Sequence, residues 1–307
     1  MKPLLLFGIV LLAHVAFSQP ALVEEIKISK QLTGDLYLAG NKKTIVLLVP
    51  GSGPTDRNGN TPGLSVTNCL KFLAEGIAGE GYDVFTYDKR VVHMLKNKTE
   101  IGELDFKHGI DDAEEIMHYL RDSLDYSNIV VTGHSEGALI GMIAARKQKA
   151  KAFVAIASPS QTIDLTLRQQ INKQAPALND ASDAILKELK NGNTVTQIPM
   201  MLQSVYALHN QPYLIDWMRY NPTEEIEKLH MPVLIISGSK DLQVEPDDAQ
   251  RLARANTQSE TVAIESMNHI LKKIENDSDN LTSYNEPELP IHPKLVEIIV
   301  NFLKKNP

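Results

Sequence analysis

Six short runs of apolar and β-branched residues recur along the chain, and each is typical of a buried strand. They are TIVLLVP (44–50), YDVFTYD (82–88), NIVVTG (128–133), AFVAIAS (152–158), PVLIISG (232–238) and TVAIES (261–266). Continuous apolar runs of this length are typical of parallel sheets, because both faces of such sheets are covered. Before the first run, residues 24–29 and 34–39 predict an opening pair of short strands.

Helical patterns separate these runs. Leu70, Leu73 and Ile77 share one face of a helix, and residues 109–124 carry a longer apolar face. Strands that alternate with helices predict an α/β protein, in which a mostly parallel sheet has helices on both faces.

One region breaks this alternation. Residues 161–229 contain no buried-strand pattern. Their helical stretches are residues 165–174, 180–192 and 200–220. Because ligands of open α/β sheets bind outside the carboxyl ends of the strands, we expect this insertion to form a helical cap over the site. The alternative is that the insertion only supports the structure and lies away from the pocket. The predicted core then comprises residues 19–160 and 230–307.

The first 18 residues have the pattern of an export signal. A basic second residue precedes an apolar run over residues 4–17, and Ala16 and Ser18 are spaced for cleavage before Gln19. The run is shorter than the roughly 20 residues that span a bilayer. We therefore predict a signal peptide over residues 1–18 and a periplasmic or secreted mature chain without membrane association. An uncleaved membrane anchor is the alternative.

Composition and charge narrow the possible functions. The chain has 307 residues, of which 43% are hydrophobic and 22% charged, and its formal charge is −7. These values are ordinary for a globular protein with a real core. The absence of a Lys/Arg block argues against a nucleic-acid partner. Cys69 is the only cysteine, so the fold cannot depend on an internal disulfide. No H-E-x-x-H or paired Cys/His pattern predicts a metal site.

Candidate chemistry begins at Ser135. This residue lies between Gly133 and Gly137, where a predicted strand turns into a predicted helix. Such a turn strains the backbone of its central residue and exposes the hydroxyl beside the helix N-terminus, which stabilises negative charge. Glycines on either side allow close packing of the turn. G-x-S-x-G alone is a weak pattern, and an ordinary tight turn is the alternative, but the placement favours a nucleophile.

A serine nucleophile needs a base, and the base needs an acid that orients it. Asp241 follows one later predicted strand and His269 follows the next, in the order Ser, Asp, His. Histidine has an intrinsic pKa suited to general base and general acid work. We therefore predict Ser135, Asp241 and His269 as the catalytic residues, with Glu265 as an alternative acid. His134 is expected to point away from the serine and to be structural.

The loop after the strand at 44–50 reads VPGSGPTDRNGN. An oxyanion hole needs a second donor from this loop, and we expect the Ser52 N–H, or that of Gly53, to join the Glu136 N–H. A dinucleotide loop is disfavoured because the third glycine is missing and Pro54 lies where the helix should begin. A calcium loop is disfavoured because its required glycine and later glutamate are absent.

A charged triplet, Asp88, Lys89 and Arg90, ends another predicted strand on the same side of the sheet. We hypothesise that Lys89 or Arg90 pairs with the Glu136 side chain and fixes the nucleophile turn. A solvated loop of mixed charge is the alternative.

The motifs GHSEGA, PGSGPTDRNGN, YDKR, GSKDLQV and MNH, in this order, resemble those of the α/β-hydrolase superfamily. They are most similar to bacterial serine carboxylesterases with a GHSEG nucleophile elbow and a PGSGPxDRxGN oxyanion loop. The resemblance covers residues 24–304 and is weakest in the cap. It implies the α/β-hydrolase fold, with Ser135 as nucleophile, Asp241 as acid and His269 as base. It also implies hydrolysis of small acyl esters without a cofactor.

Two positions depart from the pattern of these relatives. The elbow continues with Ala138 where a second glycine is common, and VVHMLKN replaces the glycine-rich continuation after YDKR. The second departure leaves the pocket wall undefined.

The sequence therefore predicts an exported serine esterase that acts on a small-molecule ester. A peptidase or amidase on the same fold is the first alternative, and an exopeptidase would need carboxylates under the cap to recognise a free amine. The candidates for that role are Glu188, Asp216, Glu224 and Glu225. A binding protein on a hydrolase scaffold is the second alternative, against which the complete Ser, Asp and His set argues. Nothing in the pattern predicts an oligomeric state.

Overall fold

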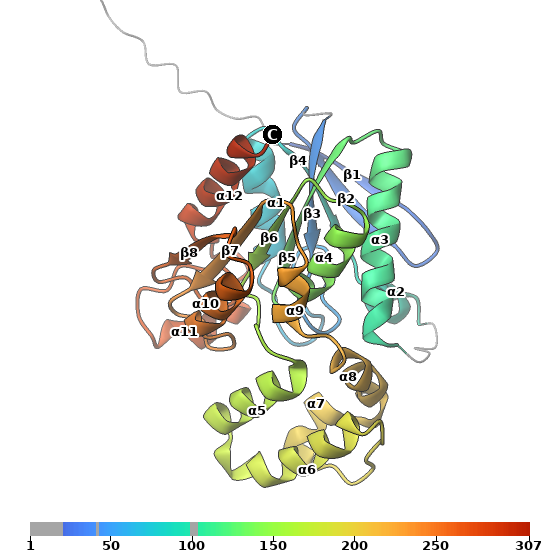
Figure 1. The fold of residues 1–307 in the computed structure, drawn as a ribbon, viewed down its shortest axis with the longest axis vertical. Coiled ribbons are helices and arrows are strands. Elements are labelled where there is room, and N and C mark those ends of the chain that lie inside the picture. The colour runs from blue at the N-terminus through green and yellow to red at the C-terminus, as the bar shows by residue number, and fades with distance from the viewer. Residues whose placement is uncertain (1–20, 41–42, 99–103) are drawn as a thin grey trace, which may run out of the picture.

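An eight-stranded sheet runs through the centre of the molecule (Figure 1). The computed structural model describes residues 21–40, 43–98 and 104–307, so the predicted signal peptide lies outside the described residues. In spatial order the strands are β1 (Leu22–Lys27), β2 (Thr33–Leu38), β4 (Asp83–Tyr87), β3 (Thr44–Val49), β5 (Asn128–His134), β6 (Ala152–Ile156), β7 (Val233–Gly238) and β8 (Glu260–Ile264). Only the pairs β1–β2 and β2–β4 are antiparallel, so the predicted mostly parallel sheet is confirmed.

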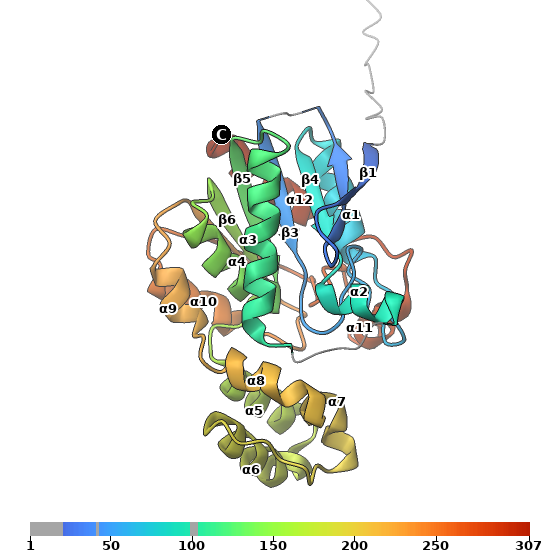
Figure 2. The same cartoon turned by 90° about the vertical axis from the view of Figure 1, so that its right-hand side faces the viewer.

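Both faces of the sheet are covered because its central strands are apolar on both sides. In β3, Ile45 and Leu47 belong to one core cluster and Val46 to the other, since successive side chains of a strand alternate between faces. The first face carries α3 (Phe106–Asp122), α4 (Glu136–Lys147) and α10 (Pro246–Ala255), and the second carries α1 (Cys69–Gly79) and α12 (Pro293–Lys305). Figures 1 and 2 show these two helical layers.

Two helix positions differ from the sequence prediction. Helix α2 (Arg90–Asn97) was not predicted, because it is only eight residues long and directly follows charged residues; Val92 is its only buried residue. Helix α3 begins at Phe106 rather than near residue 109 because a capping box sets its start. Asp105 accepts from the His108 amide at 3.0 Å, and the His108 ring accepts from the Asp105 amide at 3.1 Å.

The insertion between β6 and β7 is helical. Its elements are α5 (Ile163–Gln174), α6 (Asn179–Lys190), α7 (Gln203–Tyr206), α8 (Gln211–Trp217), α9 (Pro222–Glu227) and short 3-10 turns at Pro176–Leu178, Met200–Leu202 and Leu208–Asn210. Helices α5 to α8, called the cap from here on, lie beyond the carboxyl ends of the parallel strands (Figures 1 and 2). Helix α9 packs instead against α4 and α10 beside the sheet.

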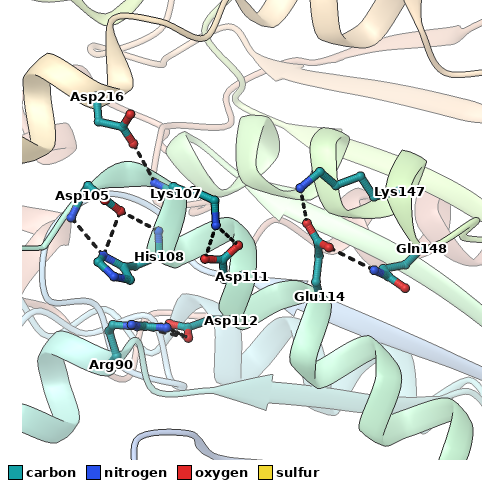
Figure 3. Close-up of polar contacts among 10 residues, drawn as sticks. All are labelled: Arg90, Asp105, Lys107, His108, Asp111, Asp112, Glu114, Lys147, Gln148 and Asp216. Carbon is teal, nitrogen blue, oxygen red and sulfur yellow. Dashed lines mark hydrogen bonds and ion pairs between the residues drawn. The ribbon is translucent and has the colours of Figure 1, made fainter.

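Helix α8 joins the cap to the N-terminus of α3. The Phe106 ring stacks on Trp217 with centroids 5.3 Å apart and meets the edge of Tyr213 at 5.9 Å. The Asp216 carboxylate accepts from the Lys107 backbone amide at 2.9 Å (Figure 3), which satisfies one of the free N–H groups at the start of a helix. One end of the cap is therefore held on the core. None of the helices in the described ranges is both long and apolar enough to span a bilayer.

Candidate active site

Ser135 sits in a sharp turn between β5 and α4, with φ 55° and ψ −123°. A residue other than glycine in such a sparsely populated conformation stores roughly 1–3 kcal/mol of strain. The neighbouring glycines make the turn possible. A Cβ on Gly133 would lie 2.3 Å from the Gly137 carbonyl oxygen, and a Cβ on Gly137 would lie 2.3 Å from that of Val49. The elbow therefore packs directly against the end of β3.

The three predicted catalytic side chains lie together at this turn. His269 Nε2 is 3.1 Å from Ser135 Oγ, and His269 Nδ1 is 2.8 Å from Asp241 Oδ2. Asp241 and His269 lie in the loops that follow β7 and β8, whose carboxyl ends are adjacent in the sheet. Glu265, the alternative acid, is exposed, and Asp241 occupies the position behind the imidazole.

The surroundings of Asp241 keep its carboxylate ionised. Burial acts to raise the pKa of Asp241, but the His269 imidazole and the backbone amides of Val244 and Gln243 outweigh burial and hold the pKa below its usual value. These amides donate to Oδ1 at 2.9 and 2.8 Å. A carboxylate only accepts hydrogen bonds, so the proton of the neutral imidazole lies on Nδ1. The Nε2 lone pair then faces the Ser135 hydroxyl.

A pair of buried side-chain amides, those of Asn268 and Asn280, connects the loops of Asp241 and His269. Asn268 Nδ2 donates to Asn280 Oδ1 at 3.1 Å and to Ser283 Oγ at 3.0 Å, and Asn280 Nδ2 donates to the Lys240 carbonyl at 2.7 Å. Asn280 belongs to the short helix α11 (Asp279–Thr282), which a 3-10 turn at Ser283–Asn285 follows. Lys240 and Asn268, which precede Asp241 and His269 in the chain, are thereby both bound to Asn280. This role of Asn268 was not predicted, because its only signal in the sequence is its place beside His269.

His134 contacts His269, the predicted base. The sequence prediction was only that His134 would point away from Ser135. Its Nε2–H donates to the His269 carbonyl at 2.8 Å, and the two ring centroids lie 5.0 Å apart. Burial, followed by the proximity of His269, lowers the pKa of His134 to about 4. The ring is therefore neutral at pH 7 and supports the loop of His269 without adding a charge beside the base.

The predicted oxyanion loop lies against the elbow. A Cβ on Gly51 would lie 3.3 Å from the Ser135 Cβ, so the loop backbone passes beside the nucleophile. Ser52 and Gly53 are exposed, and among the described residues their amides donate to no backbone or side-chain acceptor. The Glu136 amide is the first of α4 and has no intrahelical partner. The amides of Ser52, Gly53 and Glu136 that the sequence predicted as donors are thus without a protein acceptor in the described part of the chain.

Arg57 anchors this loop to three strands. Its guanidinium binds Glu25 of β1 at 2.9 Å, Asp35 of β2, and Asp88 after β4 at 3.0 Å. Its own backbone amide also donates to Asp88 at 3.0 Å. The sequence motif contained Arg57, but its partners are far apart in the chain and no local pattern identifies them.

Replacing Arg57 with Met is expected to destabilise the fold by about 3 kcal/mol, because it leaves the buried Asp88 without its main partner. In a thermal unfolding experiment the Tm should fall by roughly 6–10 °C. Lys71→Met is the control, since it removes a 3.9 Å surface pair with Glu75 and should leave the Tm unchanged within about 1 °C. Equal Tm values for the two variants would contradict the anchoring role.

The predicted oxyanion loop contains the calcium-like spacing of Asp56, Asn58 and Asn60. Across the described ranges, no group of three or more His, Cys, Asp or Glu side chains is arranged to hold a metal ion. Asp56, Asn58 and Asn60 form a turn. The Asp56 carboxylate accepts from the backbone N–H groups of Asn58 and Asn60, each at 2.9 Å.

The two cations of the charged triplet, Lys89 and Arg90, bind different carboxylates. Lys89 makes the hypothesised ion pair with Glu136, at 2.8 Å. Arg90 does not pair with Glu136, because as the first residue of α2 it reaches Asp112 of α3 and binds that carboxylate through two nitrogens (Figure 3).

The four candidate amine-recognising carboxylates all bind protein groups. Glu225 pairs with Lys228 at 2.7 Å and Arg146 at 3.3 Å, Asp216 binds the start of α3, Glu224 accepts from Asn221 at 3.0 Å, and Glu188 accepts from Asn193 at 3.0 Å. The exposed pairs contribute little to stability. Glu225 joins α9 to Arg146 of α4, and Asp216 joins α8 to α3.

Known proteins share this fold and part of this sequence. Residues 65–279 match the protein family described as serine aminopeptidase, S33. Esterase EstD of Thermotoga maritima is 29% identical over 236 residues, which are 74% of this chain and 54% of EstD. The chain thus spans about half the length of this curated relative.

Solved structures of two esterases have a similar fold. The Pyrococcus furiosus esterase Pf2001 has a TM-score of 0.61 at 17% identity, with 93% of this chain and 91% of that chain covered. Est1E from Butyrivibrio proteoclasticus has a TM-score of 0.59 at 13% identity, with 92% and 99% covered. These similarities confirm the predicted α/β-hydrolase fold.

Proposed function

We propose that this chain, which belongs to the serine aminopeptidase S33 family of α/β-hydrolases, is a serine esterase that cleaves small carboxylic esters. The observation that carries the proposal is the 3.1 Å separation of His269 Nε2 and Ser135 Oγ, with Asp241 2.8 Å behind the imidazole. The relative that is 29% identical is named an esterase, which supports esters as the substrate class.

In the acylation half of the reaction, Ser135 Oγ attacks the ester carbonyl while His269 Nε2 takes its proton. Asp241 accepts from Nδ1 and stabilises the imidazolium that forms. The tetrahedral intermediate then collapses, the C–O bond to the alcohol breaks, and His269 returns the proton to the leaving alkoxide. In the second half, His269 deprotonates a water that attacks the acyl carbonyl. The C–O bond to Ser135 then breaks, His269 returns the proton to Ser135 Oγ, and the acid is released.

The negative charge of the tetrahedral intermediate is assigned to two backbone amides. Glu136 N lies at the start of α4, where the helix dipole favours an anion. Ser52 N is the second donor because its loop runs beside the elbow and its amide is unoccupied within the described ranges; Gly53 N is the alternative. Loss of one such donor costs on the order of 3 kcal/mol of transition-state stabilisation.

Peptide or amide hydrolysis is the competing function, and the description of the family favours it. An exopeptidase must neutralise the free amine of its substrate with an available carboxylate. Asp216 and Glu225, the more buried of the four candidates, already hold α3, Arg146 and Lys228. This arrangement favours a neutral ester over a charged peptide terminus.

A substrate panel tests this choice. We expect p-nitrophenyl acetate and butyrate to be hydrolysed with a kcat/KM at least about 100-fold above that of alanine and leucine p-nitroanilides, which differ from the esters by their amide bond and free amine. A fluorophosphonate probe should label Ser135 in the same preparation. Faster cleavage of the anilides would identify a peptidase, and the absence of both labelling and hydrolysis would favour a binding protein.

The remaining assignments complete the proposal. We propose a signal peptide over residues 1–18 and export of the mature enzyme, and a cap within residues 161–229 that covers the substrate. The substrate is a small molecule, and the formal charge of −7 gives no attraction for nucleic acid. The mechanism needs no cofactor, because every proton transfer in it is made by His269.

A further inference from the structure

We propose that Lys89, Glu136 and Tyr213 form a positioning cluster that aims the oxyanion-hole amide of Ser52 at the substrate and links it to the cap. The inference rests on the proposed serine-hydrolase function. It concerns the side chains of these residues, which touch no reacting atom, and therefore differs from the assignments above.

Lys89 sets the direction of the Ser52 N–H. Lys89 Nζ donates to the Gly51 carbonyl oxygen at 3.1 Å. This oxygen and the Ser52 N–H belong to one peptide unit, and the described chain contains no cis peptide bond. In a trans peptide the C=O and N–H point in opposite directions. A lysine that holds the carbonyl on one side therefore fixes the N–H on the other side, where Ser52 is exposed.

The alternative orientation of this peptide would be harmful. A flip of the Gly51–Ser52 unit would exchange the N–H for a carbonyl oxygen, so the hole would repel the oxyanion instead of stabilising it. Gly51 has no Cβ and imposes little resistance to such a flip. The contact from Lys89 is the only hydrogen bond to the Gly51 carbonyl in the described part of the chain.

Glu136 connects the two donors of the hole. Its backbone N–H is the second proposed donor, and its carboxylate binds Lys89 Nζ at 2.8 Å. The Glu136 side chain is 1% exposed and that of Lys89 is 12% exposed, so water competes little for either charge. A single buried ion pair thus fixes the lysine that orients Ser52 and the residue that carries the other amide.

Tyr213 brings the cap into the same cluster. Its hydroxyl donates to Glu136 Oε1, the oxygen that Lys89 also binds, at 2.7 Å. Burial, followed by the charge of Glu136, raises the pKa of Tyr213 well above its usual value, so the hydroxyl keeps its proton. Tyr213 lies on α8, whose aromatic side chains pack on Phe106 of α3. The position of the cap is therefore coupled to the geometry of the oxyanion hole.

The test compares Lys89→Met with a neighbouring control. For Lys89→Met we expect kcat for p-nitrophenyl butyrate to fall by about 100-fold, close to the loss of one oxyanion donor, while KM changes by less than about threefold. A trifluoromethyl ketone of the same acyl chain should bind more weakly by a similar factor, because its serine adduct carries the oxyanion. Tyr213→Phe removes a hydrogen bond to the Glu136 carboxylate but leaves its ion pair with Lys89, and should lower kcat by about threefold to tenfold.

Arg90→Met is the matched control. It removes an ion pair of comparable burial one residue away, since Arg90 is 19% exposed and its partner Asp112 is 3% exposed. This variant should lose as much thermal stability as Lys89→Met but keep kcat and the ketone affinity within about twofold, because Arg90 touches neither oxyanion donor. Rates are divided by the concentration of sites titrated with fluorophosphonate, so that only folded enzyme is counted.

Different results overturn different parts. Wild-type kcat and ketone affinity in Lys89→Met, or equal losses in Arg90→Met, would show that the ion pair is only structural. An unaltered Tyr213→Phe would remove the link to the cap while leaving the role of Lys89. The proposed function itself fails if the wild-type protein neither hydrolyses the ester nor binds the ketone, or if it cleaves the aminoacyl anilides faster than the esters.

Discussion

Replacement of Ser135 with Ala is expected to lower kcat for p-nitrophenyl esters by about a million-fold, the size of effect seen when the nucleophile of a serine hydrolase is removed. His269 then has no hydroxyl within reach, because its Nε2 contacts only Ser135 Oγ among the described residues. The residual rate would come from the two oxyanion amides and from substrate binding. Steady-state hydrolysis and fluorophosphonate labelling measure the loss.

The matched control for this variant is Ser158→Ala. Ser158 is buried and follows the neighbouring strand β6, and its hydroxyl donates only to the Pro159 carbonyl, at 3.0 Å. It should keep kcat within about threefold. The Tm of Ser135→Ala should stay close to the wild-type value, since alanine inherits the same strained backbone conformation. Substantial ester hydrolysis by Ser135→Ala would assign the reaction to another nucleophile.

The fold was predictable because its signals are local. Each buried strand carries a continuous apolar run, as in β3, and that pattern needs no knowledge of distant residues. Helix α2 and the first residues of α3 were missed for the corresponding reason. Helix α2 is only eight residues long and follows a charged triplet, and the start of α3 is set by a polar capping box at Asp105 and His108.

The elbow was predictable from Gly133, Ser135 and Gly137 because the glycines act within five residues of chain. The packing explains them, since Cβ atoms at Gly133 and Gly137 would collide with backbone oxygens. Asp241 and His269 followed from the order of strand ends, which a parallel sheet brings to one edge. Their roles remain part of the proposed function, although the structure brings them within hydrogen-bond distance.

The supporting contacts were not predictable, since they join segments that no local pattern relates. Arg57 meets carboxylates from residues 25, 35 and 88. Tyr213 reaches Glu136 only because α8 docks on α3. Lys89 and Arg90 are neighbours with the same charge, and the start of α2 between them decides which one faces the elbow. Sequence patterns thus predict reacting groups better than the groups that hold them.

Replacement of Asp241 with Asn is expected to lower kcat by about 10,000-fold while KM changes little, because the imidazole would be held in the wrong tautomer. The backbone amides of Gln243 and Val244 both donate to Oδ1 at present. An asparagine must leave its oxygen on those donors, so its NH2 group faces His269 Nδ1. That nitrogen then accepts, the proton moves to Nε2, and Nε2 can no longer take the proton of Ser135.

Glu265→Gln separates this explanation from the alternative acid. Glu265 is exposed and follows β8 a few residues before His269, so its loss should leave kcat within about twofold of wild type. The Asp241→Asn protein should still bind substrate, because its defect lies in proton transfer and not in the pocket. Near-wild-type turnover in Asp241→Asn, together with a large loss in Glu265→Gln, would transfer the orienting role to Glu265 and require a different arrangement of the loop after β8 during catalysis.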